Sequence, residues 1–288
     1  MPVHALAVVD AAAEIHPQAT VGPFCLVRGK VVLGAGVELV SHVTVIGRTT
    51  IGDGTKVFPG AVVGGDPQDL KFKNEDSEVI IGKNCRVHEC VTVNKGTEGG
   101  GMKTVVGDDC LLMAYCHIAH DCILGNRVIV GNAANLAGHV NLADRSVVGP
   151  MTGVHHFVSV GELAYVGAMC GIKFDIPPYV IAEGNPAEPR NVNQIGMRRA
   201  GIPEDQISAM RDAYRILFHD RSRPRAEALE ELRDSLPDAA DTAVSRLVRW
   251  MERHLEQSVK GRVQEAHRPP VVGGGPGAKP IPSAPAET

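Results

Sequence analysis

The sequence predicts a parallel β-solenoid followed by a small helical region, and three features of its repeats carry this prediction. Aliphatic residues recur at every sixth position, small or β-branched residues follow four positions later, and glycine-containing tetrads such as Ile51-Gly52-Asp53-Gly54 suit tight corners. A period of six fits strands, whose side chains alternate with a period of two, but no whole number of helical turns. Three hexads would close one triangular coil that buries its inner side chains against the next coil.

Two runs of hexads share this pattern. The first run is interrupted from residue 65 to 79, and a second interruption follows its last leading residue, Val93. Its leading residues are Ile15, Val21, Val27, Leu33, Leu39, Val45, Ile51, Val57, Val63, Ile81, Val87 and Val93. The second run is unbroken, and its leading residues are Val106, Leu112, Ile118, Leu124, Val130, Leu136, Leu142, Val148, Val154, Val160, Val166 and Ile172. The repeat is therefore expected to end near Pro177.

The cysteines follow the repeat. Six of the seven occupy the small-residue slot of a hexad, namely Cys25, Cys85, Cys110, Cys116, Cys122 and Cys170. This regular placement predicts small apolar core residues rather than disulfide partners or metal ligands.

The pattern changes after residue 186, where apolar residues take helical spacing, as in Ile207, Met210 and Tyr214. We expect a solenoid domain of residues 1–186 and a helical domain of residues 187–262 with about three helices. Residues 263–288 are rich in proline and glycine, which predicts a disordered tail.

Composition argues against several classes of function. The 288 residues carry a formal net charge of -4, which gives no global case for nucleic-acid binding. No run of about 20 apolar residues predicts a membrane span, and the first ten residues lack the features of a secretion signal. We therefore expect a soluble cytoplasmic protein.

His120 is the strongest candidate for chemistry, because a histidine accepts a proton near neutral pH. Residue i should lie beside residue i+18, about 4.8 Å away, which places His120 beside Gly138 and Asp121 beside His139. The third hexad position should point away from the core, so we predict that His120 is an exposed general base. The Gly138 N–H would hold an oxyanion, unless Gly138 is simply a corner glycine. Asp121 would orient an imidazole, with His139 as the register-matched candidate, or cap a turn.

Both interruptions are expected to protrude as polar loops. The first contains Gln68-Asp69-Leu70-Lys71, and loops on a rigid stack are favoured places for ligand contacts. The second, from Asn94 to Met102, is rich in glycine but lacks the spacing and the following helix of a P-loop. We assign it no specific function.

These segments together resemble the UDP-N-acetylglucosamine O-acyltransferase family of lipid A biosynthesis, whose members are hexapeptide-repeat enzymes. The matching segments are Gln68-Asp69-Leu70-Lys71, His117-Ile118-Ala119-His120-Asp121-Cys122, Leu136-Ala137-Gly138-His139-Val140, Met151-Thr152-Gly153-Val154-His155 and Pro177-Pro178-Tyr179-Val180-Ile181. The resemblance implies a left-handed parallel β-helix and a homotrimer. It also implies transfer of an (R)-3-hydroxyacyl chain from acyl carrier protein to the 3-hydroxyl of UDP-N-acetylglucosamine, without a metal or another cofactor.

The resemblance also assigns roles by position. His120 would deprotonate the sugar hydroxyl, and the Gly138 N–H would stabilise the oxyanion derived from the thioester. The residues expected to contact the sugar, the diphosphate or the nucleotide, or to line the cleft, are Gln68, Asp69, Lys71, His117, His139, His155, Asn193 and Arg199.

Two positions depart from the family pattern. Ala200 stands where the second of two consecutive arginines is expected, which weakens the predicted nucleotide contacts around Arg199. Ala168 stands where long-chain members have glycine at the base of the acyl channel. Its extra volume predicts a preference for shorter acyl chains.

Two other classes of function also fit the repeat. One is a γ-type carbonic anhydrase, in which His117, His120 and His139 would bind zinc. The other is a non-catalytic subunit of a larger assembly. Among acyltransferases, the related N-acyltransferases carry an N-terminal uridine-binding domain, and the hexads here begin by Ile15. A 3-amino analogue of the sugar nucleotide stays open as the acceptor.

Overall fold

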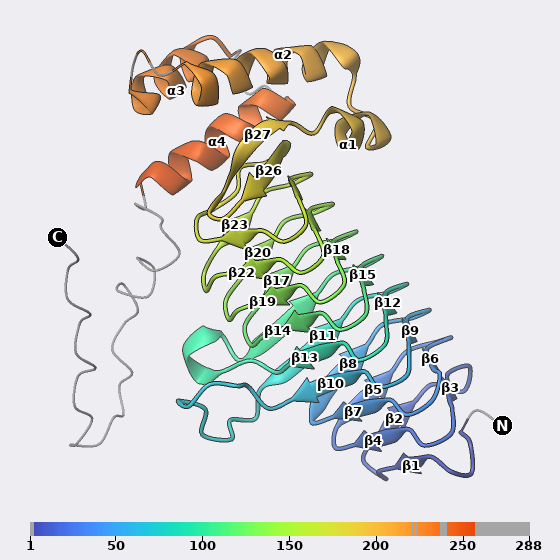
Figure 1. The fold of residues 1–288 in the computed structure, drawn as a ribbon. Helices are drawn as coiled ribbons and strands as arrows, with labels where there is room; N and C mark the ends of the chain where they lie inside the picture. The colour runs from blue at the N-terminus through green and yellow to red at the C-terminus, as the bar shows by residue number, and fades with distance from the viewer. Residues whose placement is uncertain (1–2, 221, 223, 237–240, 257–288) are drawn as a thin grey trace, which may run out of the picture.

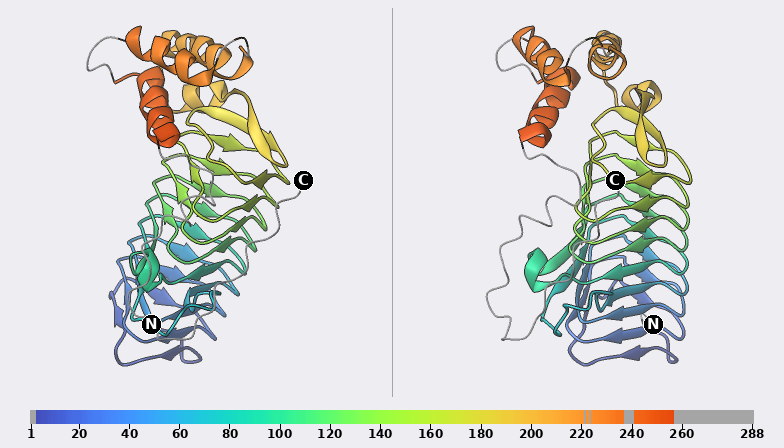
Figure 2. Two further views of the ribbon diagram at one scale, coloured as in Figure 1. Left: turned by 90° about the vertical axis from the view of Figure 1, so that its left-hand side faces the viewer. Right: turned by 60° about the vertical axis from the view of Figure 1, so that its left-hand side comes forward.

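The structure is a computed structural model that describes residues 3–220, 222, 224–236 and 241–256. Its strands form a left-handed parallel β-helix, and helices cover the C-terminal end of the stack (Figure 1). Further views show the coils stacked on one another along the length of the β-helix (Figure 2). The predicted β-helix is confirmed, whereas the predicted tail at residues 263–288 lies outside the described residues.

Three sheets form the walls, and most of their strands are only a single dipeptide long. The first wall contains β1 Val8–Val9, β4 Leu26–Arg28, β7 Thr44–Ile46, β10 Val62–Gly65, β13 Thr92–Asn94, β16 His117–Ile118, β19 Asn135–Leu136, β22 Gly153–Val154 and β25 Gly171–Ile172. The second wall contains β2 Glu14–Ile15, β5 Val31–Leu33, β8 Arg48–Ile51, β11 Glu78–Ile81, β14 Lys103–Val106, β17 Ile123–Leu124, β20 Asn141–Leu142 and β23 Ser159–Val160. The third wall contains β3 Thr20–Val21, β6 Glu38–Leu39, β9 Lys56–Val57, β12 Arg86–Val87, β15 Leu111–Leu112, β18 Ile129–Val130, β21 Val147–Val148, β24 Tyr165–Val166, β26 Val180–Gly184 and β27 Ala187–Val192.

The parallel register joins residue i to residue i+18 throughout the unbroken run, as the hexads predict. Ile118 pairs with Leu136, and Leu136 pairs with Val154. At the two interruptions the sequence separation grows, because Val63 pairs with Val93 and Val93 pairs with Ile118. The extra residues leave the walls as two loops.

The first loop spans residues 66–77 and the second spans residues 95–102, which includes a short 3₁₀ helix from Glu98 to Gly100. Both lie on the same side of the stack (Figure 1). They follow consecutive strands of the first wall, β10 and β13, which is the wall that also carries His117.

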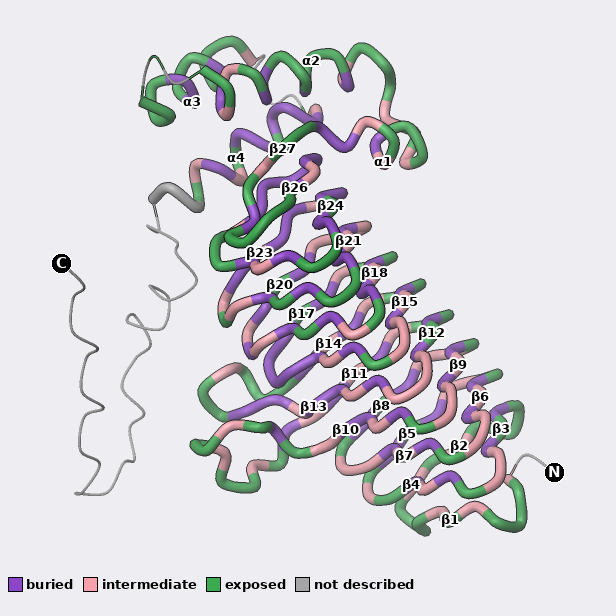
Figure 3. The backbone as a smooth tube through the Cα atoms, in the orientation of Figure 1, coloured by how far each residue is buried: buried purple, intermediate pink, exposed green. Residues whose placement is uncertain are grey.

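The interior is a continuous column of the aliphatic and small residues that the hexads identify. Buried and exposed residues alternate along each coil (Figure 3). The six predicted cysteines are buried and free, as expected for small apolar core residues. Each buried aliphatic side chain contributes about 1.5–3 kcal/mol, so the stability of the stack is spread over many coils.

Many corners carry residues other than glycine with positive φ, although the hexad pattern predicts glycine at tight corners. Asp121, His139 and Phe157 have φ of 60°, 64° and 64° and lie on successive coils. This conformation costs a residue other than glycine about 1–2 kcal/mol. Hydrogen bonds between coils offset the cost, since the His139 N–H donates to the His120 carbonyl at 3.0 Å and the Phe157 N–H to the Gly138 carbonyl at 3.2 Å.

The C-terminal cap begins with a hairpin, in which β26 pairs antiparallel with β27. Residues 187–192 therefore extend the third wall and are not helical. The described cap helices are α1 Gln194–Arg199, α2 Glu204–Tyr214, which continues as a π-helix to His219, α3 Arg225–Asp234 and α4 Ala243–Glu256. The described part of the cap thus contains four α-helices where about three were expected. No helix in the described part of the chain is long and apolar enough to cross a membrane.

A buried tyrosine ties this cap to the stack. The Tyr179 hydroxyl donates to Glu162 Oε2 at 2.9 Å, and the same oxygen lies 3.5 Å from Arg246 Nη1 of α4. Burial and the neighbouring Glu162 carboxylate raise the pKa of Tyr179, so its hydroxyl stays a donor at neutral pH. The ion pair therefore links the last coils to the cap.

Truncation of one core residue should show how strongly the stack is packed. Leu112→Ala, at a fully buried position of β15, should lower the free energy of unfolding by about 2–5 kcal/mol, measured by urea denaturation. Leu6→Ala removes the same atoms from a side chain that is 54% exposed and should cost far less. Equal losses in the two variants would contradict the packing described here.

Candidate active site

A groove of about 540 Å³ runs across four successive strands of the first wall, from β16 to β25. Its lining residues are Gln68, His117, Ala119, His120, Asn135, Leu136, Ala137, Gly138, Gly153, Val154, His155, His156, Gly171, Ile172 and Lys173. Five predicted site residues are therefore brought together here, namely Gln68, His117, His120, Gly138 and His155. Their meeting follows from the register of the coils, which stacks corresponding hexad positions.

His120 lines this groove and is only 6% exposed. The expectation of an exposed side chain is therefore wrong. A bare coil would leave the third hexad position in solvent, but here the first loop approaches the ring and the second loop contacts the neighbouring Asp121. Its Nε2 lies 4.0 Å from Asp69 Oδ2 of the first loop.

Asp121 fixes the orientation of this imidazole. His120 Nδ1 lies 2.8 Å from Asp121 Oδ2, whereas His139 Nε2 lies 3.8 Å from the same oxygen. The carboxylate therefore orients its sequence neighbour rather than the register-matched His139. Because a carboxylate only accepts hydrogen bonds, this contact assigns the proton to Nδ1 and leaves the lone pair on Nε2. Nε2 is then the atom that can accept a proton.

The Asp121 side chain is fully buried, but hydrogen-bond donors reach its carboxylate. Burial raises its pKa, but hydrogen bonds from His120 and Thr97 outweigh that effect and hold the pKa below the usual range. Asp121 is therefore ionised at neutral pH. An ionised partner stabilises the positive charge that His120 acquires when it takes up a proton.

Position 138 accepts only glycine because of this ring. A Cβ atom there would lie 2.5 Å from His120 Cε1 and 2.6 Å from Nε2. Within the described part of the chain, the Gly138 N–H has no hydrogen-bond acceptor. Gly138 thus combines a close approach to the His120 ring with an N–H that is left without an acceptor among the described residues, which is more than a corner requires.

Three further histidines surround the pair. His117 Nδ1 lies 2.7 Å from Thr92 Oγ1, and burial, followed by the nearby His120, lowers the His117 pKa. His139 stacks on Phe157 with ring centroids 4.3 Å apart and meets the His120 ring edge-on at 5.1 Å. His155 is half-buried and lines the groove. A neutral His117 presents polar nitrogens without adding charge.

Seven predicted residues do not line this groove; Asp69, Asp121 and His139 lie next to His120, and four others remain. Lys71 is exposed on the first loop, and Arg199 is exposed in the last turn of α1. The Asn193 side chain is used within the fold, since its amide donates to the Leu163 carbonyl and its oxygen caps α1. Ala168 is exposed at a corner of the third wall. Their predicted contacts stay predictions.

Other residues of the site were given no role from the sequence. His156 and Lys173 line the groove, and Thr97 contacts Asp121 from the second loop. The register points to His156, because it lies two coils beyond His120. Thr97 had no comparable signal, since the path of an irregular loop cannot be read from a repeat.

The described residues contain one group that could hold a metal ion, formed by His120, Asp121 and His139 with ligand atoms within 4.8 Å of one another. It differs from the zinc set considered from the sequence, because His117 is hydrogen-bonded to Thr92. The Asp121 carboxylate already accepts three hydrogen bonds, and His120 presents an N–H to it rather than a lone pair. These residues fit a hydrogen-bonded pair better than a metal centre.

Comparison with known proteins identifies the family. Residues 103–138 match the bacterial transferase hexapeptide family (six repeats), and residues 175–261 match the second domain of UDP-N-acetylglucosamine O-acyltransferase. The acyl-[acyl-carrier-protein]–UDP-N-acetylglucosamine O-acyltransferase of Sinorhizobium fredii is 46% identical over 226 residues, which cover 78% of this chain and 84% of the relative. The chain belongs to this acyltransferase family. The relative of the same name from Synechocystis is 45% identical over 190 residues, which cover 66% of this chain and 68% of the relative.

Solved structures of this acyltransferase family have the same fold. LpxA from Acinetobacter baumannii superposes with a TM-score of 0.83 at 34% identity and covers 88% of this chain and 97% of its own. The Arabidopsis UDP-N-acetylglucosamine acyltransferase gives a TM-score of 0.78 at 32% identity and covers 89% and 98%. Membership of the acyltransferase family favours neither the carbonic anhydrase nor the assembly-subunit alternative.

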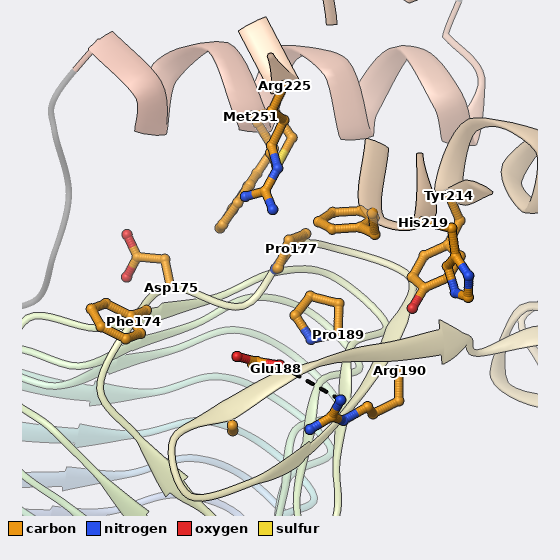
Figure 4. A pocket seen from close by; sticks show the side chains of 13 residues that line it. Phe174, Asp175, Pro177, Glu188, Pro189, Arg190, Tyr214, His219, Arg225 and Met251 are labelled. Carbon is orange, nitrogen blue, oxygen red and sulfur yellow. Dashed lines mark ion pairs between the residues drawn. The ribbon is translucent and has the colours of Figure 1, made fainter. Parts of the chain in front are cut away.

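A second cavity of about 630 Å³ lies between the β26–β27 hairpin and the helical cap of this acyltransferase (Figure 4). Arg225 extends from the cap toward Pro177, and the Glu188–Arg190 ion pair lies on the hairpin side. Asp175 also lines this cavity, and burial raises its pKa to about 7 even though Oδ1 accepts from the Ser159 N–H at 2.6 Å.

Asp175 should make stability depend on pH. Its folded pKa lies above the unfolded value, so its contribution is full below about pH 4 and is lost as pH rises toward 7. Asp175→Asn keeps an acceptor for Ser159 and should gain stability relative to the wild type across this range, by at most about 1.4 kcal/mol per pH unit. Urea unfolding between pH 4.5 and 7.5 measures the gap. A gap independent of pH, or the same trend in the exposed-site variant Asp76→Asn, would contradict this assignment.

Proposed function

We propose that the chain transfers an (R)-3-hydroxyacyl group from acyl carrier protein to the 3-hydroxyl of UDP-N-acetylglucosamine, the first step of lipid A biosynthesis. Family membership supports the substrates, because relatives with 42–46% identity carry the name of this reaction. The arrangement of His120, Asp121 and Gly138 supports the chemistry. The observation that carries the proposal is the 2.8 Å contact between His120 Nδ1 and Asp121 Oδ2, which assigns the proton to Nδ1 and leaves Nε2 as a base in the groove.

His120 acts as the general base in this proposal. Nε2 accepts the proton of the sugar hydroxyl as the hydroxyl oxygen attacks the thioester carbon. The C–O ester bond forms and the C–S bond breaks, and the proton then passes from Nε2 to the departing thiolate. Asp121 stays ionised throughout and stabilises the imidazolium.

Gly138 serves the same step from the next coil. The thioester oxygen becomes an oxyanion during the attack, and an N–H held in a rigid coil requires no reorganisation to meet it. Gln68 and His155 at the groove, with Asp69 and Lys71 on the first loop, are proposed to hold the sugar and the diphosphate. Asn193 and Arg199 are proposed for the nucleotide end.

The partners follow from the same proposal. Acyl carrier protein supplies the acyl chain, and the enzyme works as a homotrimer in the cytoplasm. The groove on the first wall is open to solvent, and a neighbouring subunit would cover it. The sugar could equally carry a 3-amino group, because a base at the same place would deprotonate either nucleophile. Parallel assays with both sugar nucleotides distinguish the acceptors.

Removal of the base tests the central claim. His120→Ala should lower kcat by about two to four orders of magnitude in an assay of acyl transfer from acyl carrier protein, because general-base catalysis is lost. His16→Ala removes an exposed imidazole from the start of the chain and should leave kcat unchanged. Activity retained by His120→Ala would refute the role of this residue.

Chain-length preference tests the role of Ala168. Ala168→Gly should favour longer chains, because the removed methyl group opens the proposed end of the acyl channel. We expect the kcat/KM ratio between a chain two carbons longer and the preferred chain to rise by about tenfold or more. Ala114→Gly makes the same change at the equivalent corner three coils earlier. An unchanged ratio in Ala168→Gly, or an equal rise in Ala114→Gly, would refute the channel role.

A further inference from the structure

The second loop, residues 95–102, lies beside the His120–Asp121 pair and is hydrogen-bonded to Asp121. The Thr97 N–H donates to Asp121 Oδ1 at 2.8 Å, and the Thr97 hydroxyl donates to Oδ2 at 2.6 Å. Thr97 itself is only 5% exposed. One residue thus supplies a donor to each carboxylate oxygen, and Oδ2 is the oxygen that also accepts from His120.

The use of this hydroxyl differs from its ordinary use at a helix start. Thr97 occupies the N-cap position of the 3₁₀ helix Glu98–Gly100, where a threonine oxygen usually accepts a hydrogen bond from the first turn. Here the side chain makes no such bond, and its hydroxyl is directed to Asp121. The loop is therefore not using Thr97 to stabilise its own helix.

The rest of the loop is shaped around the same carboxylate. A Cβ atom at Gly100 would overlap the Asp121 side chain, so this position has room only for glycine. From the other side, the Asp121 N–H donates to Thr104 Oγ1 at 2.8 Å, in the strand that follows the loop. Backbone and side chain of Asp121 are thus both held by residues of this region.

The second loop is itself anchored to the first. Lys95 Nζ lies 3.0 Å from Asp66 Oδ1 and 4.9 Å from the centre of the Phe72 ring. The Ser77 hydroxyl donates to the Gly96 carbonyl at 2.5 Å. Thr97 therefore follows a segment that is tied down at two neighbouring positions, which limits how far its donors can move.

We propose that the second loop is a positioning element for the acyl-transfer base and that Thr97 is its positioning residue. Its two donors hold the Asp121 carboxylate where Oδ2 keeps the proton on His120 Nδ1. Without the hydroxyl, the carboxylate keeps one donor on Oδ1 and can rotate away from the imidazole. This inference rests on the proposed role of His120 and adds the element that makes that role possible.

The ionisation of the Asp121 carboxylate also depends on Thr97. Hydrogen bonds from Thr97 lower the pKa of Asp121, so loss of the Thr97 hydroxyl should raise the Asp121 pKa. His117 and His139 also face this pair, together with Asp69 across the groove, and none of them changes in a Thr97 variant. The acid limb of the kcat profile should therefore move to higher pH.

Two substitutions at Thr97 separate positioning from packing. Thr97→Val keeps the shape and the backbone N–H but removes the hydroxyl, and should lower kcat by about 10- to 100-fold with KM within about twofold. Thr97→Ser keeps the hydroxyl and should restore kcat to within about threefold of the wild type. Rates are taken per folded protein, and the pH profile is recorded for each variant.

A matched control removes an equally buried hydroxyl elsewhere. The Thr55 hydroxyl donates to the Gly82 carbonyl and accepts from the Cys85 N–H, so Thr55→Val deletes two hydrogen bonds remote from His120 in sequence. It should lower stability but leave kcat unchanged. Wild-type kcat in Thr97→Val, no recovery in Thr97→Ser, or an equal kcat loss in Thr55→Val would each overturn the positioning role. An active His120→Ala would instead overturn the proposed function.

Discussion

Backbone hydrogen bonds between successive coils hold residue i beside residue i+18, and this register governs the rest of the molecule. It places Gly138 over His120, because the His139 N–H donates to the His120 carbonyl at 3.0 Å. The approach of the two residues is set by the spacing of coils, about 4.8 Å, rather than by their side chains. A slip of one residue would turn the aliphatic column outward, so the apolar core also protects the site.

The same regularity limits what the coils can do alone. Inner positions are apolar, and outer positions face solvent, so a bare coil offers no half-buried place for an ionised residue. The two loops create that place by covering His120 and Asp121. Burying a carboxylate is costly unless donors satisfy it. Here three hydrogen bonds reach the Asp121 carboxylate, two of them from Thr97.

The site therefore divides into a rigid part and a supporting part. Gly138 and the backbone of His120 belong to the stack, whose position is set by many coils. The orientation of the His120 ring depends on Asp121, and Asp121 depends on a loop that is tied to its neighbour by Lys95 and Ser77. The helical cap is connected at the far end through Tyr179 and Arg246 and lines a separate cavity.

The repeat alone determined the coil, its register and the burial of six cysteines, because a period of six leaves strands few other ways to pack. It also determined that His120 lies beside Gly138. The tertiary structure decided what a period cannot encode: that Asp121 orients His120 rather than His139, that His120 is buried, and that residues 187–192 form a strand. Each depends on irregular segments or on a corner with positive φ, where the direction of a side chain follows from contacts distant in sequence. Thr97 shows the difference most clearly, since its contact with Asp121 joins two segments far apart in the chain and has no trace in the hexad pattern.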